Sequence, residues 1–344
     1  MGITKLADLI RSNAPNAVSY KDISDYTGKV IALDTSVVLN QFRAATPSLR
    51  NLSEKIQTPV IPLTGLFFRT LTFLEHDIKP VFVFDGKPPV EKTPVILKNS
   101  SRCWRGEPRQ LVGAPPKEQE KVHMHKECKR IFHYPSAQTK DSIELLKCMG
   151  VPVIQAPGDA EAHCARLVRH GVVDAVASED MDTLPFGANV LIRQLNAKKN
   201  SEVVEYSLPR LLEKLQITHE ELVDLCILLG CDYCDKIPGL GPKKALTLIQ
   251  KHRTIENVVL HINRETHPVP LLWKYKEARK IFLDETETPV PNLMWRELDE
   301  EAVVDFLCHT KHVREERIRH RMKTFHEHRE NRRETRMDNF FRVT

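Results

Sequence analysis

The stretch GVVDAVASEDMD, residues 171–182, is a short apolar, β-branched run that breaks into acidic residues. Such a run is typical of a buried strand with polar side chains beyond its carboxyl end. Asp180 and Asp182 are two residues apart, so in extended backbone both carboxylates leave on the same side. Adjacent like charges repel each other and are tolerated mainly where a cation neutralises them. Taken alone, the stretch is equally consistent with a polar loop after a strand.

Two further apolar runs also end in an aspartate, KVIALD at residues 29–34 and KPVFVFD at residues 79–85. Open α/β sheets place their ligand sites beyond the carboxyl ends of the strands. Three strands that deliver Asp34, Asp85 and the acids after residue 178 to one edge of a sheet predict a metal site.

The segments between these strands predict helices. Thr35 or Ser36 is expected to cap a helix after the first strand, and residues 63–74 read as a buried helix. Helices are also expected over residues 118–132 and 141–149, with a strand at 151–155. This alternation predicts an α/β fold with a mainly parallel central sheet flanked by helices.

Composition limits the class of protein. The chain has 344 residues, 41% of them hydrophobic, which is enough for one large domain or two. Neither a signal peptide nor an apolar run long enough to cross a membrane is visible, so we expect an intracellular protein that does not bind membranes. The eight cysteines form no disulfide framework. The CxxC at Cys231–Cys234 lacks partners for a zinc site, so reduced thiols are expected, with zinc as the alternative.

The positive charge is unevenly distributed. Residues 311–333 contain nine Lys or Arg against four Glu, so this segment carries +5, the formal charge of the whole chain. A solvated helix face is one interpretation, and a phosphate backbone as partner is the other. Residues 86–116 contain six prolines together with basic residues and Trp104. Such a loop suits a single-stranded nucleic acid, or is a surface excursion without function.

A helix is expected to open at PGDAE, residues 157–161. Acids at a helix start are ordinary partners of the helix dipole. Asp159 and Glu161 would point apart on a regular helix, so both reach one metal only if Asp159 lies in the cap, which Gly158 permits.

A second charged site is predicted further along the chain. Thr218 and Glu221 form a capping box for an apolar helix that Gly230 ends, and Asp232 follows. The turn GLGPKK, residues 239–244, then leads into a helix with lysines in its first turn. Because lysines oppose the helix dipole there, a bound phosphate is the expected reason for them.

Together these motifs identify a family. The chain resembles the flap endonucleases of DNA replication and repair, among the structure-specific 5′ nucleases. The resemblance is carried by Met1-Gly2-Ile3, FVFDGKPP at 82–89, SEDMDTLPFG at 178–187, DLCILLGCDYC at 224–234, GLGPKKA at 239–245 and Phe340-Phe341.

The resemblance implies a set of functional residues. The metal ligands, for two Mg²⁺, would be Asp34, Asp85, Asp159, Glu161, Asp180, Asp182 and Asp232. Catalysis would rest on Lys92, which would help at the scissile phosphate, together with Asp34, Asp85 and Asp180, and Gly2 would lie near the active site. DNA contacts are implied for Arg69, Asp159, Gly230, Asp232, Gly239, Gly241, Lys243 and Lys244. Residues 239–244 would form a helix-two-turn-helix grip on duplex DNA, with a bound K⁺.

Several positions depart from the family pattern. The family expects glutamate where Asp159 stands, a stacking tyrosine at Asn40, an arginine at Pro47 and a basic residue at Asn99. A motif for the sliding clamp PCNA would include Met337, Phe340 and Phe341, but Glu334 replaces its glutamine, which predicts weak binding. The basic nuclear-import tail of the family is not seen here.

The expected function is a Mg²⁺-dependent 5′ flap endonuclease and 5′–3′ exonuclease acting on branched DNA by two-metal catalysis. The alternative is a catalytically weakened paralogue that binds junctions or the clamp. A monomer in the nucleus is expected, with the mitochondrion as a second location. The expected divisions are an N-terminal nuclease region (1–102), an arch (103–120), an internal nuclease region with the DNA grip (121–252), a basic helical region (253–333) and the clamp motif (334–344).

Overall fold

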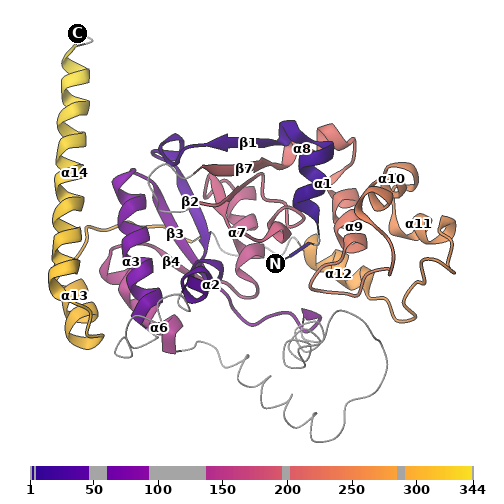
Figure 1. Cartoon of the computed structure of the whole chain (residues 1–344), viewed down its shortest axis with the longest axis horizontal. Helices are drawn as coiled ribbons and strands as arrows, with labels where there is room; N and C mark the ends of the chain where they lie inside the picture. The colour runs from indigo at the N-terminus through magenta and orange to yellow at the C-terminus, as the bar shows by residue number, and fades with distance from the viewer. Residues whose placement is uncertain are drawn as a thin grey trace, which may run out of the picture.

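The computed structural model describes residues 2–3, 5–45, 60–92, 137–195, 202–284 and 291–342, with the backbone alone at 43–45 and 333–342. A seven-stranded sheet lies at its centre (Figure 1), in the order β1-β7-β6-β5-β2-β3-β4. The strands are β1 Val18–Lys21, β2 Val30–Asp34, β3 Lys79–Phe84, β4 Val153–Gln155, β5 Ala175–Ala177, β6 Val190–Arg193 and β7 Val203–Ser207.

The sheet is mainly parallel, as the sequence predicts. Strands β2 to β6 pair in parallel, whereas β7 runs antiparallel to both β6 and β1. The strand expected from residue 172 is shorter than its apolar run, because Asp174 accepts hydrogen bonds from the Val30 amide and the Lys29 ammonium before β5 begins.

Alternate residues of each strand belong to two hydrophobic cores, one on each face of the sheet. Ala32 and Val81 pack on one face, and Leu33 and Phe82 on the other. The first core is completed by α1 Leu6–Asn13, α7 Ala160–Arg169, α8 Leu208–Leu215, α9 His219–Leu229, α10 Pro242–His252, α11 Ile255–His261 and α12 Tyr275–Phe282. The second is completed by α2 Thr35–Ala45, α3 Val60–Glu75, α6 Ala137–Cys148, α13 Glu300–Val304 and α14 Glu315–Arg342.

The arrangement separates two regions along the molecule. Helices α9 to α12 gather at one end, whereas α13 and α14 lie at the other, where α14 passes α3 (Figure 1). Arg321 of α14 donates to Glu75 and Thr72 of α3, and Arg317 lies over the Phe68 ring. Most of the basic segment 311–333 lies in α14, which begins at Glu315.

Local signals explain where several helices begin and end. The predicted capping box opens α9: Thr218 Oγ1 accepts from the Glu221 amide at 3.3 Å, and the Thr218 amide donates to Glu221 Oε2 at 3.0 Å. Gly230 ends this helix with a φ of 105°, which favours glycine. The expected cap of α2 is wrong, since α2 follows β2 without a break and the Asp34 carboxylate accepts from the Val37 amide.

No helix in the described part of the chain is long and apolar enough to cross a membrane. The helix expected at 118–132 lies outside the described residues, as do Pro47, Asn99 and the arch at 103–120.

Candidate active site

The carboxyl ends of three adjacent strands bring acidic side chains together. Strands β5, β2 and β3 are neighbours in the sheet, and they lead to Asp180, Asp34 and Asp85 respectively. Ser178 joins two of these chain segments, because its hydroxyl donates to Asp34 Oδ2 at 3.1 Å and accepts from the Asp180 amide at 3.0 Å. The predicted meeting of acids from three strands at one edge is thus observed.

The segment that carries Asp180 and Asp182 is not extended, which corrects the expectation from their spacing. Met181–Thr183 forms a 3-10 turn, and Asp180 Oδ1 accepts from the Asp182 amide at 3.0 Å. Both carboxylates still face the amino terminus. A Cβ atom on Gly2 would lie 1.9 Å from Asp180 Oδ1 and 2.4 Å from Asp182 Oδ1, so only glycine fits at this position.

Asp159 and Glu161 enter from the start of α7. Asp159 is the N-cap residue in extended backbone, so it lies in the irregular cap, as the sequence argument required. The following amide, that of Ala160, donates to Asp85 Oδ1 at 2.9 Å and ties this helix start to β3. The Tyr233 hydroxyl donates to Asp159 Oδ2 at 2.7 Å.

The Lys92 ammonium lies among the carboxylates. Its Nζ is 3.1 Å from Asp159 Oδ2, 3.2 Å from Glu161 Oε1 and 4.0 Å from Asp232 Oδ2. Burial acts to lower the pKa of Lys92, but the charges of Glu161, Asp159 and Asp232 outweigh it and raise the pKa above its usual value. The charged Lys92, whose side chain is 16% exposed, therefore partly neutralises the cluster.

Several carboxyl groups hold their protons more tightly than usual. Burial, followed by the charge of Asp85, raises the pKa of Asp34 to about 7. Burial also raises the pKa of Glu161, Asp182 and Asp232, and it is reinforced by the neighbouring acids. All seven predicted ligands therefore interact with at least one other member of the set, and their mutual repulsion favours a cation.

The residues fit a hard divalent cation by their chemistry. The donors are all carboxylate oxygens, the ligands that Mg²⁺ prefers. Asp182 is 1% exposed, and its buried Oδ1 has no hydrogen-bond partner among the described residues, the kind of orphaned acceptor that a cation would satisfy. As the described side chains stand, with the Lys92 ammonium among them, no three acidic, histidine or cysteine groups converge closely enough to hold an ion.

A second candidate site lies on α10, at the predicted DNA grip. Gly241 is the N-cap of this helix, and Lys243 and Lys244 are exposed in its first turn. Lys244 Nζ lies 2.7 Å from His267 Nε2, and His267 Nδ1 lies 3.3 Å from the Pro238 carbonyl oxygen. His267 therefore fixes both the turn at Gly239 and one of the two lysines.

Arg279 braces this region from α12. Its guanidinium donates to both oxygens of Asp224 on α9, at 2.7 and 2.8 Å, and to both oxygens of Glu256 on α11, at 2.9 Å each. Asp224 Oδ2 also accepts from the Ile255 amide at 3.0 Å. Three helices around the grip are thus linked by one arginine.

Arg69 lies in a different environment from the one its implied DNA contact suggests. It is buried on α3, where its Nη1 donates to Gln41 Oε1 at 2.8 Å and its guanidinium lies over the Phe42 ring. Burial lowers its pKa to about 10. Asn40, on the neighbouring turn of α2, is exposed.

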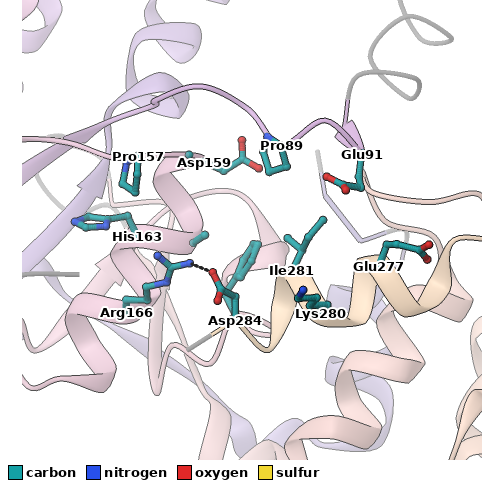
Figure 2. A pocket seen from close by; sticks show the side chains of 13 residues that line it. Pro89, Glu91, Pro157, Asp159, His163, Arg166, Glu277, Lys280, Ile281 and Asp284 are labelled. Carbon is teal, nitrogen blue, oxygen red and sulfur yellow. Dashed lines mark hydrogen bonds and ion pairs between the residues drawn. The ribbon is translucent and has the colours of Figure 1, made fainter. Parts of the chain in front are cut away.

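A cavity of about 720 Å³ adjoins Asp159 on the side of α12. Figure 2 shows Pro89 and Glu91 on one side and the α12 side chains on the other, with Arg166 of α7 paired to Asp284 at 3.0 Å. His163 lines this cavity and is buried, and within the described part of the chain neither of its ring nitrogens has a hydrogen-bond partner.

Sequence reasoning did not single out Tyr233, Ser178, His267 or His163. Tyr233 and Ser178 are close in sequence to predicted ligands, and that closeness was the available signal. His267 and His163 had none, since their partners and surroundings depend on packing between separate helices. The clamp residues Met337, Phe340 and Phe341 lie on the backbone of α14, which continues to Arg342, but their side chains are outside the described set.

Comparisons with known proteins agree with this arrangement. The XPG N-terminal domain matches residues 1–103 and the XPG I-region matches residues 150–232. A probable flap endonuclease 1 homolog of Danio rerio is 55% identical over 95% of this chain and 85% of its own length. Flap endonuclease 1 of Xiphophorus maculatus is 43% identical over all of this chain and 91% of its own length. This chain belongs to the flap endonuclease family.

Solved structures share its fold. Flap endonuclease-1 from Methanococcus jannaschii aligns with a TM-score of 0.69 and 25% identity, over 92% of this chain and 97% of that one. The catalytic core of Rad2 in complex with a DNA substrate aligns with a TM-score of 0.73 and 21% identity, over 94% of this chain and all of that one. Membership of the flap endonuclease family makes this chain a DNA nuclease, a hydrolase of phosphodiester bonds, with the 5′ nuclease fold.

Proposed function

We propose that this chain is a Mg²⁺-dependent 5′ flap endonuclease, with 5′–3′ exonuclease activity, that acts on branched DNA intermediates of replication and repair. The observation that carries the proposal is the gathering of acids at the edge of the sheet, three of them within 4.0 Å of Lys92 Nζ, with Asp182 Oδ1 buried and without a hydrogen-bond partner among the described residues. Such a cluster has no use in a protein that only binds phosphates, because it repels them unless cations are present.

Two Mg²⁺ would be held by Asp34, Asp85, Asp159, Glu161, Asp180, Asp182 and Asp232. Bound there, they would supply an activated water and charge stabilisation for both the attacking and the leaving oxygen. Binding would require the carboxylates to turn toward the ions. Three of these carboxylates, those of Asp159, Glu161 and Asp232, lie within 4.0 Å of the Lys92 ammonium.

The protein's own residues would have distinct tasks in cleavage. The Lys92 ammonium, which lies beside Asp159 and Glu161, would bind the scissile phosphate, where a fixed positive charge stabilises the transition state. Tyr233 holds Asp159 through its 2.7 Å hydrogen bond, and Ser178 holds Asp34 and the Asp180 segment in register. Gly2 lets the amino terminus approach the carboxylates closely.

The grip on duplex DNA would be separate from this chemistry. Gly239, Gly241 and the α10 amides form a turn suited to a phosphate, Lys243 and Lys244 add positive charge, and Gly230 and Asp232 link the turn to the active site. We further propose K⁺ at this turn, weak binding of PCNA through residues 334–341, action as a monomer and a nuclear location.

A cleavage assay tests the proposed function. A 5′ flap substrate labelled at the flap should be cut near the junction with Mg²⁺ and left intact with EDTA, whereas a matched nicked duplex should yield only short exonuclease products. Binding of the flap substrate without cleavage at any Mg²⁺ concentration would favour the weakened, junction-binding paralogue. None of the described residues supports that alternative at present.

A further inference from the structure

The loop CDYC that follows α9 contains two thiols in contact. Cys231 Sγ and Cys234 Sγ are 3.8 Å apart, and the two side chains are 8% and 7% exposed. Among the described cysteines, no other sulfur pair is in hydrogen-bond contact. The loop itself reaches the surface, since Asp235 and Lys236 are exposed directly after it.

The two residues between the cysteines belong to the candidate active site. The Asp232 carboxylate is 37% exposed and lies 4.0 Å from Lys92 Nζ. Tyr233, in contrast, is held by its hydrogen bond to Asp159 and by edge contacts of its ring with Phe186 and Phe282.

The loop is anchored at both ends. At the start, the Gly230 amide donates to the Cys226 and Ile227 carbonyls as α9 ends. At the far end, the Trp273 indole donates to the Asp235 carbonyl, which holds the backbone just beyond Cys234. Between these anchors Tyr233 is fixed by its hydrogen bond to Asp159, whereas the Asp232 carboxylate is partly exposed and 4.0 Å from Lys92 Nζ, so a contraction between the cysteines would displace mainly Asp232.

We propose that Cys231 and Cys234 are a site of reversible oxidation, and that their closure to an intrachain disulfide withdraws Asp232 from the acidic cluster. The effect on cleavage rests on the proposed function, whereas formation of the disulfide does not. A disulfide has an S–S length of about 2.05 Å, so the sulfurs, now 3.8 Å apart, must approach each other by about 1.8 Å.

The oxidant that would form this disulfide is a peroxide. One cysteine sulfur attacks a peroxide oxygen, the O–O bond breaks, and the hydroxide released takes the thiol proton to form water, which leaves a sulfenic acid. The second sulfur then attacks the sulfenic sulfur, the S–S bond forms and the S–O bond breaks, and the hydroxide leaves with the second thiol proton as water. Two thiols lose two electrons, one peroxide is reduced, and a dithiol reductant reverses the change.

The expected consequence is a loss of cleavage with little loss of duplex binding. A displacement of about 1 Å at a group that positions reacting atoms costs up to about 10² in rate. We expect the single-turnover cleavage rate to fall at least tenfold on oxidation and to return on reduction, while the grip at α10 keeps its affinity for duplex DNA.

The test uses the full chain, reduced and then exposed to hydrogen peroxide in small molar excess. Mass spectrometry should show a loss of two hydrogens, and peptide mapping should locate the bond between residues 231 and 234. The chain has eight cysteines, so mapping is essential. Cys231→Ser and Cys234→Ser each remove the bond and should keep cleavage in peroxide, and Cys308→Ser, on the far side of the sheet, is the matched control that should behave as wild type.

Each outcome decides a separate point. Absence of a 231–234 bond under conditions that oxidise other cysteines overturns the proposal, and so does a mapped bond that leaves the cleavage rate unchanged. If the reduced chain cuts no flap substrate at all, the proposed function fails, and the mapped bond together with loss of Mg²⁺ binding measured by calorimetry still tests the withdrawal of Asp232.

Discussion

The acidic cluster and the α10 grip differ in burial and in the interactions that stabilise them. Most of the cluster is buried, its carboxylates repel one another, and three of them share the Lys92 ammonium, so an added cation would stabilise it further. The grip exposes its lysines, and its framework rests on backbone turns and on the Arg279 brace between three helices. The first suits chemistry at one phosphate, and the second suits affinity for many. Changes in the two regions should therefore separate cleavage from binding.

The largest effect is expected at the cluster. Asp180→Ala removes a predicted ligand and a charge that repels phosphate, so cleavage should fall by about 10³ or more while binding of a flap substrate persists or tightens. Single-turnover cleavage and a filter-binding titration measure the two quantities. Asp8→Ala, at an exposed acid paired with Arg11, is the control and should match wild type. Cleavage by Asp180→Ala within tenfold of wild type would remove Asp180 from the metal site.

The second prediction concerns the stability of the metal-free protein. Because Asp34 keeps its proton to about pH 7 in the folded state, the unfolded chain releases its proton first as pH rises from about 4. The folded state then binds more protons than the unfolded state, and the free energy of unfolding falls across this window by about 1.4 kcal/mol for each pKa unit. Urea denaturation in EDTA at several pH values measures the slope.

Two controls keep this prediction specific to the cluster. Asp34→Asn removes the titrating group and should flatten the decline between about pH 4 and 7. Mg²⁺ added near pH 8 should restore stability to the wild type, because it binds the ionised folded state. A decline of equal slope in Asp34→Asn would assign the pH dependence to groups other than Asp34, among them Glu161, Asp182 and Asp232, whose pKa values burial also raises.

The sequence predicted those features that local pattern and strand order determine. The runs at 29–34 and 79–85 form adjacent parallel strands of one sheet, so the aspartates at their carboxyl ends meet at the same edge. The capping box at Thr218 and the glycine end of α9 are likewise local. Strands β1 and β7 were not predicted, because β1 is short and pairs with β7 across more than 180 residues, and β7 is fixed by its antiparallel pairing with both β1 and β6.

Contacts between distant segments also escaped prediction. Tyr233 and Asp159 are 74 positions apart, and Lys244 and His267 are 23 apart, so only packing brings them together. The turn at Asp180 escaped for a different reason: the carboxylate caps its own 3-10 turn, and spacing alone suggested extended backbone. The buried position of Arg69 follows from its contacts with Gln41 and Phe42 of α2, which its place in the chain does not reveal.

The third prediction addresses the grip. Lys243→Ala combined with Lys244→Ala should weaken duplex binding about tenfold at moderate salt and flatten the log–log salt dependence by roughly one to two units. Cleavage at saturating enzyme should change little. Lys251→Ala, at the other end of α10, is the matched control and should leave the slope unaltered. An unchanged slope in the double variant would show that these lysines are solvated and do not contact phosphates.

The smallest effects should come from Tyr233 and His267, which position a residue of the cluster and a residue of the grip through hydrogen bonds. Variants at these two positions give the most specific test of the comparison. Tyr233→Phe keeps the ring contacts with Phe186 and Phe282 but removes the donor to Asp159, so single-turnover cleavage should fall several-fold with no change in the salt slope of binding. His267→Phe removes the 2.7 Å contact that fixes Lys244, so duplex affinity should fall several-fold with no change in the saturated cleavage rate. The two variants are controls for each other, since each removes one hydrogen-bonding group from one region. If Tyr233→Phe weakens binding as much as it slows cleavage, or if His267→Phe slows cleavage at saturation, then the cluster and the grip are coupled through the loop between Gly230 and Gly239, and the division between chemistry and affinity is wrong.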